Sequence, residues 1–290
     1  MSDKALHLER GSRSWPELLS QIDAAPDELW LRGRVEWLAR EPKVAIVGTR
    51  APTAYGEAQA RRFARTLAES GVVVVSGLAR GIDAAAHEAA LDQGGATIAV
   101  LGCGVDRPWP GGPLAERVAR DGLLLSEHRP GEAPKKHHFP LRNRLISGLC
   151  RAVVVIEAAH ASGSLITARW AVDQDRAVFA LPGRVDHPMS RGCHRLLRDG
   201  AQLVEDPDEV LGELGLTPRV ARAAPDHLEQ DDEALPAARE LLALLQGETL
   251  TPDELCERTR RSTAEVLTTL VQLEFAGRVA RGAGTLYRLV

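Results

Sequence analysis

Two short segments place glycine, hydroxyl and arginine side chains soon after runs of apolar residues. Gly48, Thr49 and Arg50 follow one apolar run, and Ser162–Thr167 follows another. Glycine lets the backbone approach a ligand, and the N–H groups at the start of a helix attract anions. Arginine adds a planar cation suited to phosphate. Both segments are candidates for phosphate binding, although a tight turn with a surface arginine and an ordinary serine cap explain them equally well on local grounds.

The stretch His128–Arg151 is an outlier in charge, because it carries six lysines and arginines and a single acidic residue, Glu132. Within it, Lys135–Arg144 interleaves cations with Phe139 and Asn143. Cations follow a phosphate backbone, and an aromatic face stacks on a base with a gain of ~1–3 kcal/mol. The stretch therefore predicts contact with a single-stranded nucleic acid. The alternative is a basic surface loop that Phe139 fastens to the core.

Patterns typical of catalysis and metal binding are missing. The sequence has no GxxxxGK[ST] and no GxSxG segment, His87-Glu88 is not followed by histidine at position 91, and the four cysteines form no CxxC pair. P-loop hydrolysis, a serine nucleophile, a zinc site and a disulfide framework are therefore not supported. Arginine and glycine bind anions but offer little for proton transfer. We predict a binding protein with no cofactor, no metal and no catalytic residue.

Five apolar runs predict strands that are buried on both faces. Helix-like segments separate them, and this alternation predicts an extended Rossmann-like α/β fold with a doubly wound, mainly parallel sheet. The strands are expected at Val44–Val47, Val72–Val75, Ile98–Leu101, Val153–Ile156 and Ala177–Leu181, and the helices at Gly56–Ser70, Asp83–Gln93, Pro113–Asp121 and Leu165–Gln174. Ligands of such sheets bind beyond the carboxyl ends of the strands, so the candidate segments should face one site. Asp83 is expected to cap its helix.

The rest of the chain suggests further parts around a core domain at 42–216. Residues 1–41 are too short for a core of their own and are expected to pack on that domain. Prolines and an acidic patch predict a linker at 217–233. Residues 234–290 predict a small C-terminal winged-helix domain with three helices and a hairpin. Its helix starts are marked by Thr251 before a proline and by the capping box of Ser262 and Glu265.

Composition limits where a nucleic acid could bind and where the protein works. The net charge of −4 means that any basic surface must be local. No apolar run approaches the ~20 residues that span a bilayer. The first residues carry charges and no apolar segment of the signal-peptide type. A cytoplasmic protein with reduced cysteines and no membrane contact is expected.

Taken together, the motifs resemble the DNA-processing protein A family (DprA, also called Smf). The resemblance runs from about Trp15 to Glu205 and rests on VAIVGTR (44–50), VSGLARGIDAAAH (75–87), HFPLRNRLISGL (138–149), SGSLITARWA (162–171) and ALPG (180–183). It implies an extended Rossmann fold that binds single-stranded DNA without catalysis. It also implies a homodimer that loads the RecA recombinase onto incoming DNA during natural transformation, working against single-strand binding protein.

The resemblance also carries roles over to residues of this chain. It implies DNA contact by Arg50, Lys136 and Phe139, and secondary roles for Gly48, Thr49, Arg142, Asn143 and Thr167 in matching motifs. His194 departs from the asparagine usual after Ser-x-Gly, which leaves the polar role of that position open. The dimer and RecA surfaces are assigned only loosely, to Gly192–Val204.

Two rival functions stay open from the sequence. A Rossmann-like nucleotide-processing enzyme would need a PGGxGTxxE-type motif, which ALPGRVDHP lacks. A winged-helix regulator would read DNA with residues 218–290, whose nine basic and twelve acidic residues give a net charge of −3. Against that charge stands a cluster of Arg258, Arg260 and Arg261 near the third helix.

Overall fold

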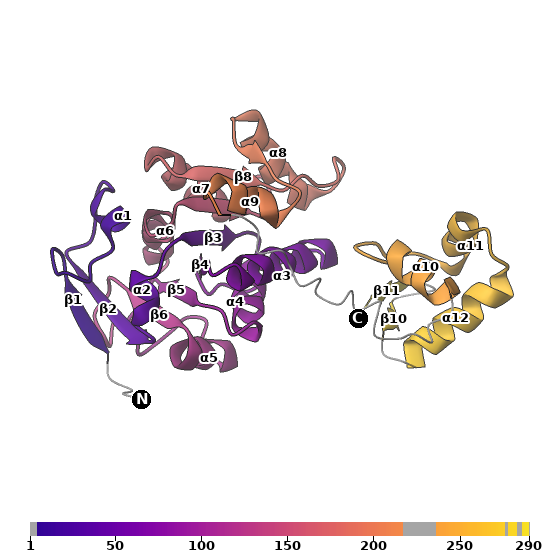
Figure 1. Ribbon diagram of the computed structural model, residues 1–290, viewed down its shortest axis with the longest axis horizontal. Coiled ribbons are helices and arrows are strands. Elements are labelled where there is room, and N and C mark those ends of the chain that lie inside the picture. The colour runs from indigo at the N-terminus through magenta and orange to yellow at the C-terminus, as the bar shows by residue number, and fades with distance from the viewer. Residues whose placement is uncertain (1–4, 217–235, 276–277, 283–285, 290) are drawn as a thin grey trace. The chain divides into compact units, whose positions relative to one another are not determined.

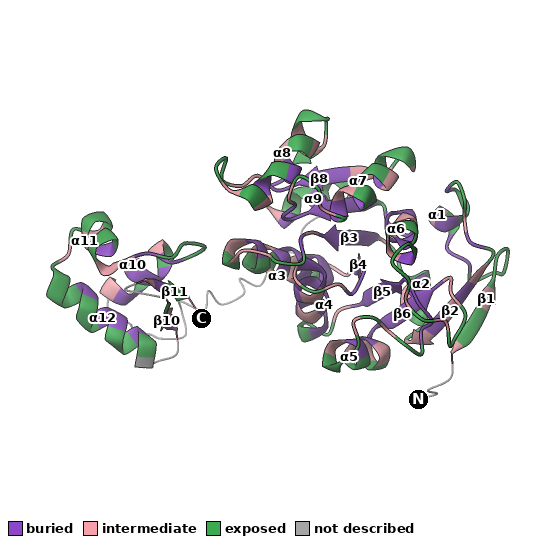
Figure 2. Ribbon diagram, turned by 180° about the vertical axis from the view of Figure 1, so that it is seen from behind, coloured by how far each residue is buried: buried purple, intermediate pink, exposed green. Residues whose placement is uncertain are grey.

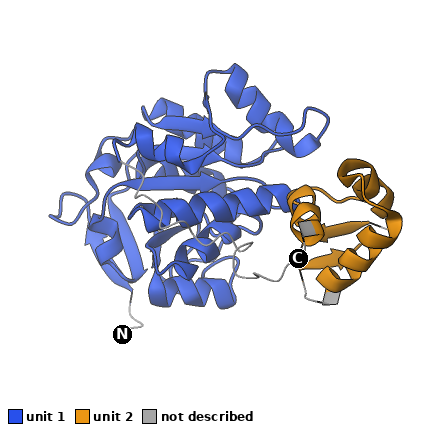
Figure 3. Ribbon diagram, turned by 45° about the vertical axis from the view of Figure 1, so that its right-hand side comes forward, with its two compact units in different colours: residues 1–219 blue, residues 220–290 orange. Residues whose placement is uncertain are grey.

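The computed structural model describes residues 5–216, 236–275, 278–282 and 286–289. The chain divides into two compact units, residues 1–219 and 220–290, which are coloured separately in Figure 3. The expected linker at 217–233 lies outside the described residues. None of the helices in the described ranges combines the length and the apolar character that crossing a bilayer requires.

Unit 1 is built on one sheet of nine strands in the order β1-β2-β6-β5-β4-β3-β7-β8-β9 (Figure 1). The two pairs β1–β2 and β2–β6 are antiparallel, and the other six are parallel, which confirms the predicted doubly wound, mainly parallel sheet. The strands are β1 (Leu6–Glu9), β2 (Glu28–Gly33), β3 (Lys43–Val47), β4 (Val73–Ser76), β5 (Thr97–Leu101), β6 (Leu123–Ser126), β7 (Ala152–Val155), β8 (Ala177–Ala180) and β9 (Gln202–Leu203).

The strand order changes direction between β3 and β7. From β3 the chain builds outward through β4, β5 and β6, and then returns to place β7 on the other side of β3. The loops after β3 and after β7 therefore leave the sheet in opposite directions. Such a switch point opens a crevice at the carboxyl ends of the two strands, which is where ligands of doubly wound sheets bind.

Helices cover both faces of the sheet and enclose two apolar cores. On one face Phe63 and Leu67 pack with Ile46 and Val74, and on the other Leu145 packs with strand residues of the opposite parity. Figure 2 shows the central strands as buried and the outer sides of the helices as exposed. The helices of unit 1 are α1 (Glu17–Ser20), α2 (Glu36–Ala39), α3 (Ala54–Glu69), α4 (Ile82–Asp92), α5 (Pro113–Asp121), α6 (His138–Gly148), α7 (Ser164–Asp173), α8 (Arg191–Arg198) and α9 (Pro207–Glu213).

One region of unit 1 differs from the expectations. The sequence leaves a surface loop as the alternative for the basic segment around Phe139, but from His138 onward the segment forms α6. The segment shows no clear helical period because α6 buries polar as well as apolar side chains, Arg142 and Ser147 among them. Residues 1–41 contribute β1, β2, α1 and α2, and Leu19 and Leu29 lie in the core of unit 1.

The described residues of unit 2 form three helices and a two-stranded sheet, as the winged-helix prediction required. Its elements are α10 (Pro236–Leu244), α11 (Pro252–Thr259), α12 (Thr263–Phe275), β10 (Val279–Arg281) and β11 (Tyr287–Leu289). The Thr251 hydroxyl accepts a bond from the Glu254 N–H, and the Glu254 side chain accepts the Thr251 N–H in return. Ser262 and Glu265 form the same pair of bonds. Leu241, Leu255 and Leu270 belong to a core made entirely of unit 2 residues.

Candidate nucleic-acid interface

A groove of about 700 Å³ lies at the switch point. Its lining comes from the turn after β3, the loop after β4, the loop after β7, and the two helices α6 and α7. All eight residues singled out from the sequence lie in this lining: Gly48, Thr49, Arg50, Lys136, Phe139, Arg142, Asn143 and Thr167. Segments more than 100 positions apart in the sequence thus form one surface.

The turn Gly48–Arg50 is held tightly by backbone contacts. The Thr49 N–H donates to the Glu157 carbonyl at 2.7 Å, and the Ile82 N–H donates to the Thr49 carbonyl at 3.2 Å. A Cβ on Gly48 would lie 2.6 Å from the Ile82 side chain, so glycine is required there for close packing. Thr49 is buried, whereas Arg50 is exposed and directed away from the core. The turn is therefore rigid and positions Arg50 at the surface.

Glu157, directly beyond β7, fixes the start of α3, and the sequence analysis missed it. Its carboxylate accepts the Thr53 N–H at 2.9 Å and the Thr53 hydroxyl at 2.6 Å. A Cβ on Gly56 would lie 2.2 Å from that carboxylate, so Gly56 leaves the space for it. The sequence feature that could have identified Glu157 is an acidic residue at the end of a wholly apolar run. Glu157 links the two strands that flank the switch point.

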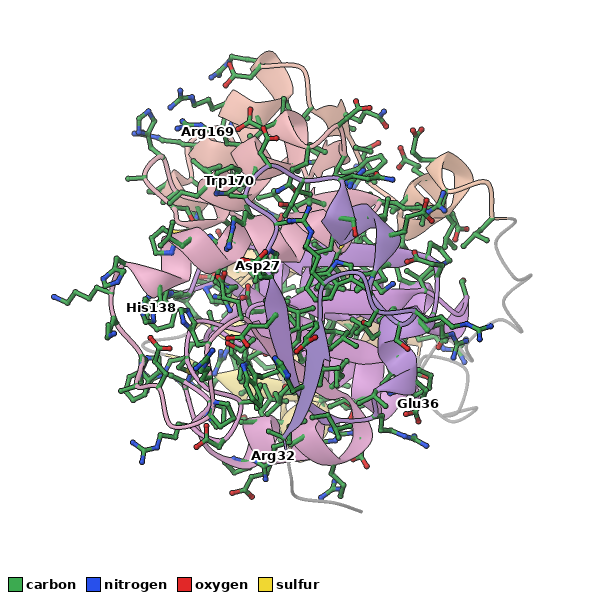
Figure 4. The ribbon with its side chains drawn as sticks, turned by 90° about the vertical axis from the view of Figure 1, so that its left-hand side faces the viewer. Asp27, Arg32, Glu36, His138, Arg169 and Trp170 are labelled. Atoms are coloured by element: carbon green, nitrogen blue, oxygen red, sulfur yellow. The ribbon has the colours of Figure 1, made fainter. Side chains whose placement is uncertain are left out.

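The helix α6 brings Lys136 and Phe139 to the groove. Lys136 lies just before the helix and is exposed, and Phe139 is its second residue and is half-buried. His138, the first residue, is buried and lies at one margin of the view in Figure 4. A Cβ on Gly102 would lie 3.2 Å from the Phe139 ring, so the ring packs closely on this glycine. One part of the ring contacts protein and the rest faces the groove.

Arg142 has a different environment from Lys136 although both lie in the same basic stretch. It is 4% exposed, and its Nη1 donates to the carbonyls of Gly77, at 3.0 Å, and Val100. Burial lowers the pKa of Arg142 to about 10, and the charge of Asp83 opposes this shift. Its guanidinium thus binds carbonyls of the protein itself. We assign Arg142 a positioning role in the groove.

Asp83 does not cap α4, contrary to the expectation. The N-cap of α4 is Gly81 and makes no side-chain bond. Asp83 lies inside the first turn, and its Oδ2 accepts the N–H groups of Gly77 at 3.0 Å and Ala79 at 3.4 Å. Burial raises the pKa of its carboxyl, and the charge of Arg142 partly offsets this. The carboxylate thereby shapes the loop between β4 and α4.

The start of α7 forms the opposite wall of the groove. The Asn143 amide donates to the Gly163 carbonyl at 3.3 Å, which joins α6 to this wall. The hydroxyls of Ser162 and Ser164 are 2.7 Å apart, and Thr167 is buried behind them. The wall therefore presents small polar groups near a helix N-terminus, an arrangement that favours anions.

Three of the six cations of the basic stretch are paired with carboxylates of the protein. Lys135 lies 3.4 Å from Glu132, Arg129 lies 3.0 Å from Glu28, and Arg144 forms a two-bond pair with Glu127. Arg50 and Lys136 form no ion pair with any described residue. Both are exposed and line the groove. The positive charge available to a ligand is thus much smaller than the sequence total and is concentrated at two side chains.

His194 also has a defined place. Its Nε2 lies 3.0 Å from the carbonyl of Gly183, to which it donates. The bond joins α8 to the loop after β8. The side chain is therefore used for internal contact, and it does not line the groove.

These features define a class of protein. It is a Rossmann-like α/β protein that has a positively charged groove at its switch point and a separate winged-helix unit. Residues 7–215 match the family described as DNA recombination-mediator protein A, and residues 222–285 match the DprA winged helix domain. The chain belongs to the DNA recombination-mediator protein A family.

Characterised relatives cover most of the chain. Protein Smf of Escherichia coli is 43% identical over 281 residues, which is 94% of this chain and 74% of that protein. The DNA processing protein DprA of Streptococcus pneumoniae is 48% identical over 201 residues, 69% of this chain and 71% of that protein. Its X-ray structure superposes with a TM-score of 0.69 at 46% identity, covering 72% of this chain and 74% of that one. A Helicobacter pylori DprA structure, described as showing a single-stranded DNA binding mode, superposes with a TM-score of 0.66 at 34% identity, covering 73% of this chain and 95% of that one.

Proposed function

We propose that this protein binds single-stranded DNA in the groove at the switch point, without catalysis, and loads the RecA recombinase onto the bound strand. The observation that carries the binding is the meeting of two exposed, unpaired cations, Arg50 and Lys136, with the half-exposed ring of Phe139 in one groove. The DNA-binding mode described for the Helicobacter pylori relative supports the same ligand.

Each residue has a distinct part in this proposal. Arg50 and Lys136 neutralise phosphates, and Phe139 stacks on a base. Gly48 and Thr49 mount Arg50, while Asn143 and Thr167 form the polar wall. Because a single strand exposes both its phosphates and its base faces, this combination fits it better than a duplex, whose bases are stacked inside.

The chemistry of the lining supports binding rather than turnover. Among the described residues that line the groove, the only carboxylate is that of Asp83, which is 7% exposed and bonded to two backbone N–H groups. Neither Arg50 nor Arg142 is suited to exchange protons at neutral pH. A general acid and base within reach of one reacting atom are thus not provided.

The proposed site is tested by measuring affinity for a fluorescent oligonucleotide at several salt concentrations. Each phosphate neutralised on a single strand releases ~0.7 counterion, so Arg50→Ala and Lys136→Ala should each weaken binding and reduce the slope of log K against log salt by roughly 0.7. Lys135→Ala is the matched control, because Lys135 is adjacent to Lys136 but does not line the groove. It should leave the slope nearly unchanged. Equal slopes in the wild type and in both groove variants would contradict the proposal.

Recombinase loading has its own test. The protein should speed assembly of RecA filaments on DNA that is already coated with single-strand binding protein, and Arg50→Ala should abolish this effect. Filament assembly that is equally fast without the protein would refute loading and leave DNA binding intact.

We further propose that the active form is a homodimer that uses the surface Gly192–Val204, which also remains the expected surface for RecA. This surface includes the sheet edge β9, where Leu203 is 50% exposed. An exposed apolar side chain on an edge strand favours pairing with another chain. Leu203→Lys should shift the sedimentation behaviour toward the monomer, whereas an unchanged dimer would exclude this edge.

A further inference from the structure

Three potential metal ligands lie together on the segment that leads into α6. They are His128, Glu132 and His138, and one ligand atom of each lies within 4.8 Å of the others. None of them lines the DNA groove. His138 is buried and is labelled in Figure 4, while the other two are partly exposed. The cluster was not apparent from the sequence, because the spacing 128, 132, 138 matches no familiar metal motif.

The distances suit a tetrahedral divalent ion. Bonds of ~2.0–2.1 Å place neighbouring ligands roughly 3.4 Å apart around zinc. His128 Nδ1 lies 3.4 Å from Glu132 Oε2, and His138 Nε2 lies 3.7 Å from Glu132 Oε1. The two imidazole rings are stacked with their centroids 4.0 Å apart, so the His128 ring has to turn out of the stack to direct its nitrogen to the same point as His138 Nε2.

The hydrogen bonds leave the correct nitrogen of His138 available. Its Nδ1 lies 3.1 Å from the carbonyl of Gly102, and because a carbonyl only accepts, Nδ1 carries the proton. In the neutral ring, Nε2 then directs a lone pair toward the carboxylate of Glu132. Two acceptors that face each other repel unless a proton or a metal ion lies between them. A histidine whose second nitrogen donates to a backbone carbonyl is also the usual state of a metal ligand.

His128 and Lys135 complete the surroundings. Among the described residues, the buried Nε2 of His128 has no hydrogen-bond partner, so the ring has no competing bond that would fix it. Lys135 lies 3.4 Å from Glu132 and opposes a metal by its charge. Its side chain is 56% exposed, and it can turn into solvent when the carboxylate binds an ion.

We propose that His128, Glu132 and His138 bind one divalent transition-metal ion, with zinc as the best match. Imidazole ligands select zinc over magnesium or calcium, which prefer oxygen. Three protein ligands leave a fourth position for water. The ion ties both ends of the segment from Glu132 to His138 together, and this segment carries Lys136. The site thereby fixes one wall of the groove.

The proposal is tested with metal alone, on the full chain after removal of any histidine tag. Equilibrium dialysis against zinc should show one tightly bound ion per chain, and cobalt should give the intense visible absorption of a tetrahedral site. Loss of a single ligand in Glu132→Gln or His128→Ala should weaken binding more than ~100-fold, beyond the ~10–100-fold that loss of an outer partner causes. Glu132→Gln keeps the shape of a partly exposed side chain and so preserves the fold.

The matched control is His137→Ala, because His137 is exposed and adjacent to His138 but is not in the cluster. It should bind zinc as the wild type does. Magnesium should not compete. The absence of a stoichiometric ion in the wild type, or equal zinc binding by the wild type, His128→Ala and Glu132→Gln, would overturn the proposal. Because no DNA is present, failure here is independent of the proposed DNA binding.

Discussion

Asp83 and Arg142 hold the same residue, Gly77, by its two backbone groups. The Gly77 N–H donates to the Asp83 carboxylate at 3.0 Å, and the Gly77 carbonyl accepts from Arg142 at 3.0 Å. A Cβ on Gly77 would lie 2.7 Å from the guanidinium and 2.9 Å from the carboxylate. The two buried charges thus enclose the loop after β4 and give the floor of the groove one shape. Both charges therefore hold this loop in place beside the groove that Arg50 and Lys136 line.

Arg142→Ala is therefore expected to act first on stability. It removes the positive charge that acts on the buried Asp83 carboxylate and leaves two carbonyls without their donor, and each buried polar group left without its partner costs ~1–3 kcal/mol. The free energy of unfolding in urea measures the loss. Asn143→Ala serves as control, since Asn143 is partly exposed and loses hydrogen bonds with a net value of ~0.5–1.5 kcal/mol each. Equal losses in the two variants would show that Arg142 is not a structural residue.

The sequence predicted the parts of the fold that depend on local pattern. Apolar runs such as Val72–Val75 become central strands because strands covered on both faces need apolar side chains throughout. Leu123–Ser126 forms β6 but was not predicted, because leucine favours helices as readily as strands. The strand β9 has only two residues, and its existence depends on pairing with β8. Elements of this kind are decided by tertiary contacts.

For the site, the sequence identified the segments but not the division of roles. Lys136 and Arg142 are both cations in one stretch, yet Lys136 lies at the surface whereas Arg142 is buried, with an exposed fraction of 4%. Arg144 is paired with Glu127, 17 positions away, and this pairing follows from the fold. Glu157 was missed because an acidic side chain gains its meaning only when Thr53 is brought beside it.

His87 is expected to make stability depend on pH. Burial lowers its pKa to about 3 in the folded state, from an ordinary value of 6.5. The Thr97 hydroxyl donates to the Val74 carbonyl, so His87 Nδ1 donates to Thr97, and among the described residues its buried Nε2 has no partner. As the pH falls from 6.5 to 3, the unfolded chain takes up the proton first. This one group should lower stability by up to about 1.4 kcal/mol per pH unit in that window.

The comparison that isolates this group is with His87→Gln. As the pH drops below 6.5, the unfolding free energy of the wild type should fall relative to that of the variant. Above pH 7.5 the difference between the two should not change with pH. Other groups titrate in both proteins, so their contributions cancel. A difference that does not change with pH would mean that His87 titrates normally in the folded protein.

Phe139 should contribute to DNA affinity through stacking alone. Phe139→Leu keeps an apolar side chain against Gly102 but removes the aromatic face. The affinity for single-stranded DNA should fall by ~1–3 kcal/mol, with an unchanged salt slope, because stacking releases few counterions. Phe139→Tyr should bind nearly as the wild type does. Fluorescence anisotropy at several salt concentrations separates the two effects. A reduced salt slope in Phe139→Leu would instead show that the ring positions Lys136.

Deletion of residues 218–290 tests whether the winged helix is the primary DNA reader. Among the described residues, the apolar cores of unit 1 contain none beyond Leu216, so residues 1–217 should fold alone. In unit 2, Arg258 is paired with Glu248 and Arg261 with Glu240, each at 2.8 Å, so two of the three clustered arginines are already neutralised within the unit. The truncated protein should therefore lose less than tenfold in affinity, or ~1.4 kcal/mol. Arg50→Ala introduced into the truncated chain should weaken binding as it does in the full chain. If the truncated protein is folded by circular dichroism but no longer binds, the groove is not the main site, and the winged helix carries the affinity.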